Sequence, residues 1–154
     1  MNIITWNVRG LRRPAKRFLV RNFLNLHFAD VCCLQELKLE AISQSLWGEI
    51  GETKLDQFAF VPAEGSAGGI IMGWNSGVLN GSFSKIGFFC LRMDFYSKGD
   101  NRLWRCTSVY GPNARASKQA FWEELRECAP TPATPWIICG DFNAIFEVGD
   151  KSSG

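Results

Sequence analysis

Four short apolar stretches of this sequence end in polar side chains that could bind a metal ion or a phosphate. These side chains are Asn7, Glu36, Tyr110 with Asn113, and Asp141 with Asn143. Carboxylates and carboxamides at the ends of buried strands are costly to keep there without partners. Oxygen ligands in small number suit Mg²⁺ or Mn²⁺, which binds through one or two carboxylates plus a phosphate. Amide and phenol groups would then contact phosphate oxygens, and a second carboxylate could orient a water molecule.

Each of these residues taken alone has a plainer explanation. An Asn at the end of a strand more often forms a turn, and an Asp there more often caps a helix. The same kind of residue nevertheless recurs at four strand ends. This recurrence favours a shared site over four independent turns.

The charge of the chain is unevenly distributed. The net charge is only +2, which does not require a nucleic-acid partner, but the first acidic residue is Asp30. Six basic residues precede it: Arg9, Arg12, Arg13, Lys16, Arg17 and Arg21. Such a segment could follow a phosphate backbone. The alternative is that it forms the solvated face of a helix.

The length and composition indicate one globular domain. The chain has 154 residues, of which 46% are hydrophobic and 13% aromatic, enough for one sizeable core. Its six cysteines have no CxxC spacing and its one histidine is His27, so they predict buried reduced thiols rather than a zinc site. We find neither a signal-peptide pattern nor a membrane-spanning stretch. We therefore expect an intracellular protein, nuclear or cytoplasmic, with no membrane association.

The order of the predicted elements is β-α-β-α, a block of strands, then α-β. The strands are expected over 2–7, 30–36, 57–63, 68–74, 78–84, 86–96, 103–110 and 136–141, and the helices over 14–28, 40–50 and 118–128. Helical spacing places Leu19, Phe23 and Leu26 on one stripe of the first helix, and Phe121, Leu125 and Cys128 on one stripe of the last. Runs that are apolar on both faces indicate sheets covered on both sides. The fold class is therefore mixed α/β or α+β.

Five motifs in order resemble the endonuclease/exonuclease/phosphatase superfamily. They are "TWNVRGL", "VCCLQELK", "GSAGGIIMGW", "SVYGPNA" and "IICGDFNAI", and together they extend over nearly the whole chain. Within that superfamily, the motif sequences "WNVRGL", "LQE" and "YGP" are most similar to those of the endonuclease domains of plant LINE-type (non-LTR) retrotransposons. The resemblance implies an α+β fold, an αββα sandwich of two packed sheets flanked by helices. It also implies metal-dependent cleavage of phosphodiesters or phosphomonoesters, with DNA as the expected partner; no obligate protein partner can be inferred.

The resemblance also implies a metal site at the first two strand ends. By position, Glu36 would be the principal ligand of Mg²⁺ or Mn²⁺, and Asn7 would lie beside it in the metal and hydrogen-bond network. Lys38 would lie near the metal. Some relatives carry an acidic residue where this chain has Arg9, so metal binding here is expected to depend more heavily on Glu36.

The remaining motif residues are implied to act on the phosphate and the water. By resemblance, Tyr110 and Asn113 would contact the scissile phosphate, and Asn143 would hold it. Asp141 would orient or deprotonate the attacking water. Arg115 lies near a family arginine that contacts DNA, although the spacing differs by a residue or two.

One part of the family pattern is missing from this chain. The family mechanism uses a further Asp and a catalytic His after the last motif, and the only histidine here, His27, falls in an early predicted helix. We therefore expect residues 1–154 to form a single domain that is incomplete at its C-terminus. Two alternatives to an active Mg²⁺-dependent endonuclease follow: an inactive remnant of a retrotransposon, or a module that binds metal and phosphate.

Overall fold

The computed structural model describes residues 1–65 and 68–144. The strands are β1 (Ile3–Asn7), β2 (Val31–Gln35), β3 (Gln57–Val61), β4 (Ile70–Trp74), β5 (Leu79–Ile86), β6 (Cys90–Ser97), β7 (Arg102–Tyr110) and β8 (Trp136–Asp141). The helices are α1 (Pro14–Leu26), α2 (Gln44–Gly51) and α3 (Lys118–Glu127), with a short 3₁₀ turn η1 (Arg115–Ser117) before α3. The expected incompleteness after the last motif lies outside these described residues.

The strands form two four-stranded sheets. One has the order β1-β2-β4-β3 and the other β5-β6-β7-β8. The pairs β1–β2 and β7–β8 are parallel, whereas all other neighbouring strands are antiparallel. The two strands of a parallel pair run in the same direction, so their carboxyl ends lie side by side. Each sheet therefore has one end at which the carboxyl ends of two neighbouring strands lie together.

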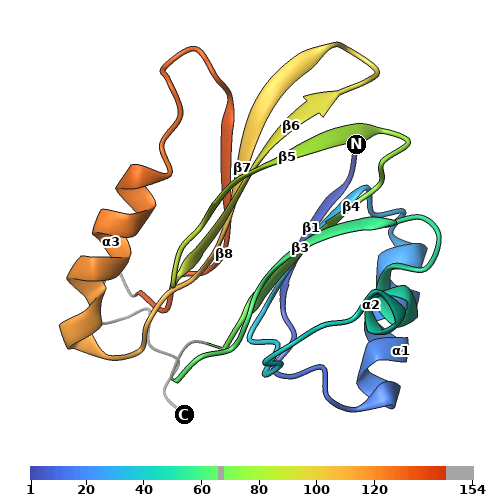
Figure 1. Ribbon diagram of the computed structural model, residues 1–154, viewed down its shortest axis with the longest axis horizontal. Coiled ribbons are helices and arrows are strands. Elements are labelled where there is room, and N and C mark those ends of the chain that lie inside the picture. Colours follow the sequence, from blue (N-terminus) through green and yellow to red (C-terminus); the bar gives the residue numbers. More distant parts are fainter. Residues whose placement is uncertain (66–67, 145–154) are drawn as a thin grey trace.

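The two sheets pack face to face, with α1 and α2 outside the first sheet and α3 outside the second (Figure 1). The inner faces share a buried cluster that includes Cys33, Met72 and Phe95. A second cluster lies under α1 and α2, and a third lies under α3. This arrangement confirms the predicted α+β sandwich. In the described part of the chain, no helix has the length and apolar character needed to cross a membrane.

The prediction that Leu19, Phe23 and Leu26 form the buried stripe of α1 is wrong. Leu19, Phe23 and Leu26 are 51%, 39% and 71% exposed, and the buried side chains of this helix are Arg17, Val20 and Leu24. The helical period is the same, but the buried face is a different one. Arg17 occupies that face because its guanidinium binds Glu49 at 2.5 Å and donates to two loop carbonyls. Sequence hydrophobicity could not reveal a buried arginine that has so many partners.

The stripe expected on α3 is confirmed. Phe121, Leu125 and Cys128 are all buried against the second sheet. The predicted boundary between the strands over 78–84 and 86–96 differs from the observed one. In the structure, β5 continues to Ile86 and β6 begins only at Cys90. The connection between the two strands is held by Glu124 of α3, whose carboxylate accepts hydrogen bonds from the backbone N–H groups of Phe88, Phe89 and Cys90.

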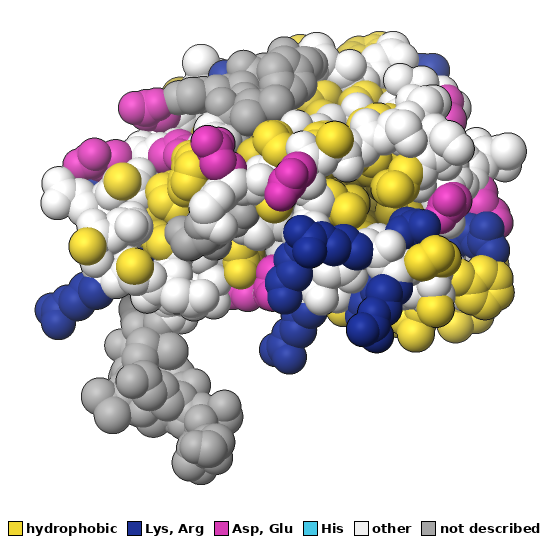
Figure 2. Space-filling model, turned by 60° about the horizontal axis from the view of Figure 1, so that its bottom comes forward, with side chains coloured by type: hydrophobic (Ala, Val, Ile, Leu, Met, Phe, Trp, Pro, Cys, Tyr) yellow, Lys and Arg dark blue, Asp and Glu magenta, His cyan; other side chains and the backbone are white. Residues whose placement is uncertain are grey.

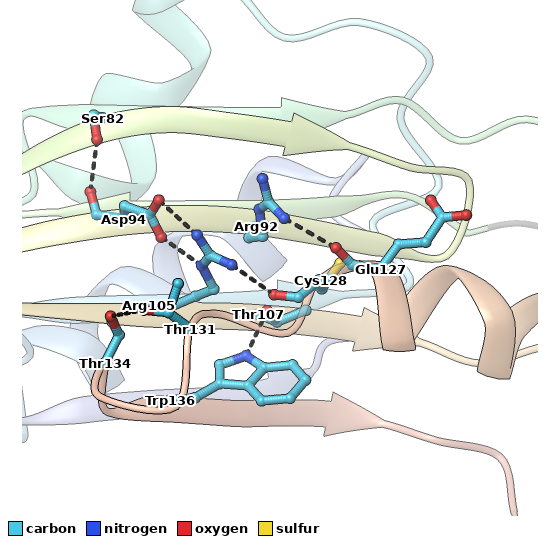
Figure 3. A network of polar contacts seen from close by, with 10 residues as sticks. All are labelled: Ser82, Arg92, Asp94, Arg105, Thr107, Glu127, Cys128, Thr131, Thr134 and Trp136. Atoms are coloured by element: carbon cyan, nitrogen blue, oxygen red, sulfur yellow. Dashed lines mark hydrogen bonds and ion pairs between the residues drawn. The ribbon is translucent and has the colours of Figure 1, made fainter.

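A network around Arg105 fixes the segment that leads into β8 (Figure 3). The guanidinium donates two hydrogen bonds to the carboxylate of Asp94, at 2.6 and 2.9 Å, and one to the carbonyl of Cys128. Trp136, the first residue of β8, donates from Nε1 to the hydroxyl of Thr107. The chain from α3 to β8 is therefore held on the outer face of the second sheet.

We expect Arg105→Met to lower the free energy of unfolding by about 2 kcal/mol, because it leaves the Asp94 carboxylate and the Cys128 carbonyl without their donor. Urea denaturation would measure this loss. The matched control is Arg102→Met, because the Arg102 side chain is 78% exposed and approaches Asp100 only to 3.8 Å. The control should cost less than about 0.5 kcal/mol. Equal losses in the two variants would contradict the role of the Arg105 network.

Candidate active site

The carboxyl ends of β1, β2, β7 and β8 meet at one end of the sandwich. Asn7 and Gln35 are paired at the ends of β1 and β2, and Tyr110 and Asp141 are paired at the ends of β7 and β8. Nδ2 of Asn7 donates a hydrogen bond to Oδ2 of Asp141 at 2.7 Å, which joins the two sheets. Residues 134 positions apart in the sequence thus share one site.

Asn7 and Asp141 also form local turns. Oδ1 of Asn7 accepts a hydrogen bond from the backbone N–H of Arg9 at 3.2 Å, and Oδ1 of Asp141 accepts one from the N–H of Asn143 at 3.0 Å. Both are Asx turns, in which a side chain closes on the backbone two residues further along. The turn-forming explanation and the shared site are therefore compatible. The turns fix the two side chains in the orientation in which they meet.

Glu36 lines a pocket of ≈ 370 Å³ together with Lys38 and Tyr110. Its side chain is 20% exposed, and Oε1 lies 3.2 Å from Nζ of Lys38. The backbone around it is held tightly, because its carbonyl accepts a hydrogen bond from the N–H of Gly10 at 2.7 Å. These contacts keep the carboxylate at the opening of the pocket.

Gly68 makes the close approach of Glu36 and Tyr110 possible. A Cβ at position 68 would lie 2.9 Å from Cα of Glu36 and 3.0 Å from Cε1 of Tyr110. A side chain here would force the backbone of Glu36 and the ring of Tyr110 to shift. The glycine therefore allows the segment before β4 to pack directly against the candidate site.

Tyr110 pairs with Asp141 across β7 and β8 and lines the same pocket as Glu36. Burial raises the pKa of its phenol above the usual range, and the negative charges of Glu36 and Asp141 raise it further. The pKa shift favours the neutral hydroxyl, which can donate a hydrogen bond. Tyr110 is thus suited to contact a phosphate oxygen.

The predicted phosphate contacts divide into two groups. Asn143 is held in place, since its Nδ2 donates to the carbonyl of Gly111 at 2.7 Å and its own carbonyl accepts a hydrogen bond from Lys118. Asn113 and Arg115 lie on the exposed connection between β7 and α3. Within residues 1–65 and 68–144, neither of these two side chains forms a hydrogen bond or an ion pair. The structure therefore brings Asn143 into the site and leaves Asn113 and Arg115 at its surface.

Four residues around the site have a left-handed backbone. They are Arg9, Glu36, Lys38 and Asn143, with φ between 45° and 56°. They make up four of the seven non-glycine residues with positive φ in the described segments. Such conformations are costly for side chains other than glycine, and they cluster at functional sites in other proteins. The distribution of backbone strain supports this end of the sandwich as the functional one.

The donor set fits a hard divalent cation bound with few protein ligands. Glu36 offers a carboxylate at the pocket, and Oδ1 of Asn7 has a lone pair beyond the one used by Arg9. Mg²⁺ accepts such a sparse set when waters and a substrate phosphate complete its shell. The ammonium of Lys38 lies against the Glu36 carboxylate. Binding of a divalent cation to Glu36 would therefore compete with this ion pair.

The basic N-terminal segment has two different roles. Arg17 and Arg21 form ion pairs with Glu49 and Glu52, the first on α2 and the second at its end, so they join α1 to α2. The other four, Arg9, Arg12, Arg13 and Lys16, line a pocket of ≈ 570 Å³ together with Lys38. Figure 2 shows Lys and Arg side chains gathered on the face that carries the strand ends. This surface would attract a polyanion.

The sequence interpretation gave no role to Gln35. This side chain is 1% exposed, and its Nε2 lies within hydrogen-bond distance of the Thr5 hydroxyl, the Cys33 carbonyl and the Ser108 hydroxyl. It therefore bridges the two sheets directly below the site. The sequence did contain a signal for this role, because Gln35 is a polar residue at the end of the apolar run "VCCLQ". His27, by contrast, lies at the far end of β1, where its backbone carbonyl accepts a hydrogen bond from Asn2.

Comparison with known proteins identifies relatives of this arrangement. The profile of the endonuclease/exonuclease/phosphatase family matches residues 4–151. A comparison with curated proteins found no match. Among solved structures, the catalytic domain of human nocturnin is similar at 15% identity and a TM-score of 0.66, covering 90% of this chain and 63% of that one.

Two further solved structures come from proteins that act on DNA or belong to mobile elements. D. rerio TDP2, complexed with a single-strand DNA product, is 18% identical with a TM-score of 0.65, over 93% of this chain and 61% of that one. The endonuclease domain of TRAS1, a telomere-specific non-LTR retrotransposon, is 11% identical with a TM-score of 0.65, over the same shares of the two chains. At these identities the likeness is one of fold. This chain spans less than two thirds of the length of all three structures.

We expect Asn7→Asp to make stability strongly dependent on pH. The new carboxylate would face Asp141 at hydrogen-bond distance, which raises the folded-state pKa of one of the two above its unfolded value near 4. Stability is then lost as pH rises through that raised pKa. The variant should be less stable at pH 8 than at pH 5 by at least about 1 kcal/mol, in urea denaturation.

Asn7→Ala is the matched control, because it removes the same hydrogen bond without adding a charge. It should show no additional loss between pH 5 and pH 8. A similar pH dependence in both variants would mean that Asn7 and Asp141 are not neighbours.

Tyr110 should ionise above the usual tyrosine pKa of about 10. The chain has two tyrosines, so subtracting the ultraviolet titration of Tyr110→Phe from that of the wild type isolates this phenol. Glu36→Gln should lower its midpoint, because one neighbouring negative charge is removed. A wild-type midpoint at or below 10 would contradict the combined effect of burial and the two neighbouring negative charges.

Proposed function

We propose that this chain, which belongs to the endonuclease/exonuclease/phosphatase family, is a Mg²⁺-dependent, endonuclease-like phosphodiesterase that acts on nucleic acid. The observation that carries the proposal is the position of the basic pocket beside the joined strand ends. The pocket of Arg9, Arg12 and Lys38 shares two of its residues, Arg12 and Lys38, with the pocket that Glu36 and Tyr110 line. A polymer of phosphates can occupy both pockets at once, whereas a small phosphomonoester would use only one.

Glu36, with Asn7 beside it, is the proposed holder of the metal ion, which when bound neutralises charge on a phosphate oxygen. Tyr110 donates its hydroxyl hydrogen to another phosphate oxygen. Lys38 would offer a positive charge to the same phosphate if a metal ion were bound at Glu36. These groups bind and orient the phosphodiester at the opening of the pocket.

Asp141 is the proposed base. The donors Asn7 Nδ2 and Asn143 N–H each occupy one lone pair of its carboxylate, so the group is fixed in direction and retains one lone pair on each oxygen. It can accept a proton from an attacking water. Asn143, held by Gly111 and Lys118, is the proposed support of the phosphate, and Asn113 and Arg115 are proposed to extend the contact along the nucleic acid.

We also propose that the domain derives from a LINE-type retrotransposon of the plant kind. The support is the wording of its motifs, "WNVRGL", "LQE" and "YGP", together with the fold that it shares with the TRAS1 endonuclease domain. DNA is then the expected nucleic acid.

The second candidate is a module that binds metal and phosphate without appreciable turnover. It is favoured by one observation: the only histidine of this chain, His27, lies at the opposite end of β1 from Asn7. A positioned imidazole typically contributes 10²–10⁴-fold to the rate of such a reaction. Cleavage by this chain alone would then be slow.

The test is the nicking of supercoiled plasmid DNA in the presence of Mg²⁺. Wild type is expected to nick, and Glu36→Gln and Asp141→Asn are each expected to lower the rate by about 10²-fold or more. Chelation by EDTA should abolish the reaction. The matched control is Glu40→Gln, because Glu40 lines the same pocket but has no proposed role; its rate should stay within about twofold of wild type.

Two other outcomes decide between the proposals. Equal nicking by all variants would mean that a contaminating nuclease is responsible, and the enzyme proposal would fail. Mg²⁺-dependent DNA binding that is lost in Glu36→Gln, without any nicking by wild type, would establish the binding module instead.

A further inference from the structure

Three cysteines from three different strands meet between the two sheets. They are Cys33 on β2, Cys106 on β7 and Cys139 on β8, and their sulfur atoms all lie within 4.8 Å of one another. The sulfurs of Cys33 and Cys106, which belong to opposite sheets, are 3.9 Å apart. No sequence pattern predicts this cluster, because the three residues are far apart in the chain.

The cluster is buried but can be reached from one side. Cys33 and Cys106 are 0% exposed, whereas Cys139 is only partly buried. Cys139 lies on β8, an edge strand of the second sheet, and β1 is the facing edge strand of the first. Thr5 of β1 is exposed, so the side of the sandwich between these two edges leads to the sulfurs.

The spacing of the sulfurs fits one soft metal ion. Three sulfurs bound to a single d¹⁰ ion at about 2.3 Å lie about 4.0 Å apart in a trigonal arrangement. The 3.9 Å between the sulfurs of Cys33 and Cys106 matches this value, and the sulfur of Cys139 lies within 4.8 Å of both. Soft thiolate ligands select Cu(I) or zinc among the biological metals.

The number of ligands distinguishes these two metals. In the part of the chain that the structure describes, no histidine, carboxylate or further cysteine joins the three sulfurs. Structural zinc sites are almost always four-coordinate, whereas a three-sulfur set suits a softer ion of lower coordination number. We propose that Cys33, Cys106 and Cys139 bind one Cu(I) ion in a three-sulfur site beneath the candidate active site.

The protons of this step go to solvent. The three sulfurs bind the metal as thiolates. Binding of Cu(I) to the three thiols therefore releases their three protons to solvent, without any change of oxidation state. The open side at Cys139 allows solvent to offset the negative charge that results.

The first test is Cu(I) binding to the full chain under anaerobic, reducing conditions, measured by competition with a chromogenic Cu(I) chelator. Wild type is expected to hold one Cu(I) per chain. Cys139→Ser should weaken binding by more than about 100-fold, since loss of even an outer-shell partner typically costs 10–100-fold. Cys139 is the preferred position because it is only partly buried, which favours folding of the variant.

The matched control is Cys90→Ser. Cys90 is a buried thiol of the same sheet, but it packs under α3 rather than between the sheets, so Cu(I) affinity should be unchanged. Equal loss in both variants, or no copper retained by wild type, would overturn the proposal.

The second measurement needs no variant. X-ray absorption of the wild-type Cu(I) complex should show three sulfur neighbours and no nitrogen or oxygen ligand. Two sulfurs, or tighter binding of Zn²⁺ than of Cu(I) in direct competition, would overturn the assignment. Neither readout depends on nuclease activity, so the proposal stands or falls separately from the proposed function.

Discussion

The packing of the two sheets against each other is the constraint on which the rest of this structure depends. Val31, Met72 and Phe95 belong to the continuous apolar layer between the sheets, and burial of such side chains stabilises by about 1.5–3 kcal/mol each. The Asn7–Asp141 hydrogen bond that joins the strand ends contributes about 1.5–3 kcal/mol, no more than one such side chain and far less than the whole layer. The polar contact therefore does not bring the sheets together. It becomes possible because the hydrophobic layer already holds them at the right separation.

The backbone conformations of the candidate site reduce the stability that the packed sheets provide. Arg9, Glu36, Lys38 and Asn143 adopt left-handed backbone conformations, each of which costs of order 1 kcal/mol or more. Buried Gln35 and the Arg105 network offset this cost, the first by bridging the sheets under the site and the second by fixing the segment before β8. The site is thus rigid where the fold supports it from below. Asn113 and Arg115, which lack such support, lie exposed in the connection between β7 and α3.

Much of the fold was predictable, because strand and helix patterns are local. Each predicted strand and helix is present, and Phe121 and Leu125 lie on the buried face expected of α3. The buried face of α1 was not predictable, since the burial of Arg17 depends on Glu49 of another helix. The division of the basic segment, in which Arg17 and Arg21 pair with acids while Arg9 and Arg12 line a pocket, has the same cause.

The sequence by itself determined the residue types at the strand ends, the order of the motifs and the α+β class, because these depend on neighbouring residues. It did not determine which strand ends would touch. The contact of Asn7 with Asp141, the bridge made by Gln35 and the meeting of Cys33, Cys106 and Cys139 all join residues from different sheets. Only the tertiary structure decided these contacts, because the separation and register of two packed sheets result from the sum of many side-chain volumes between them.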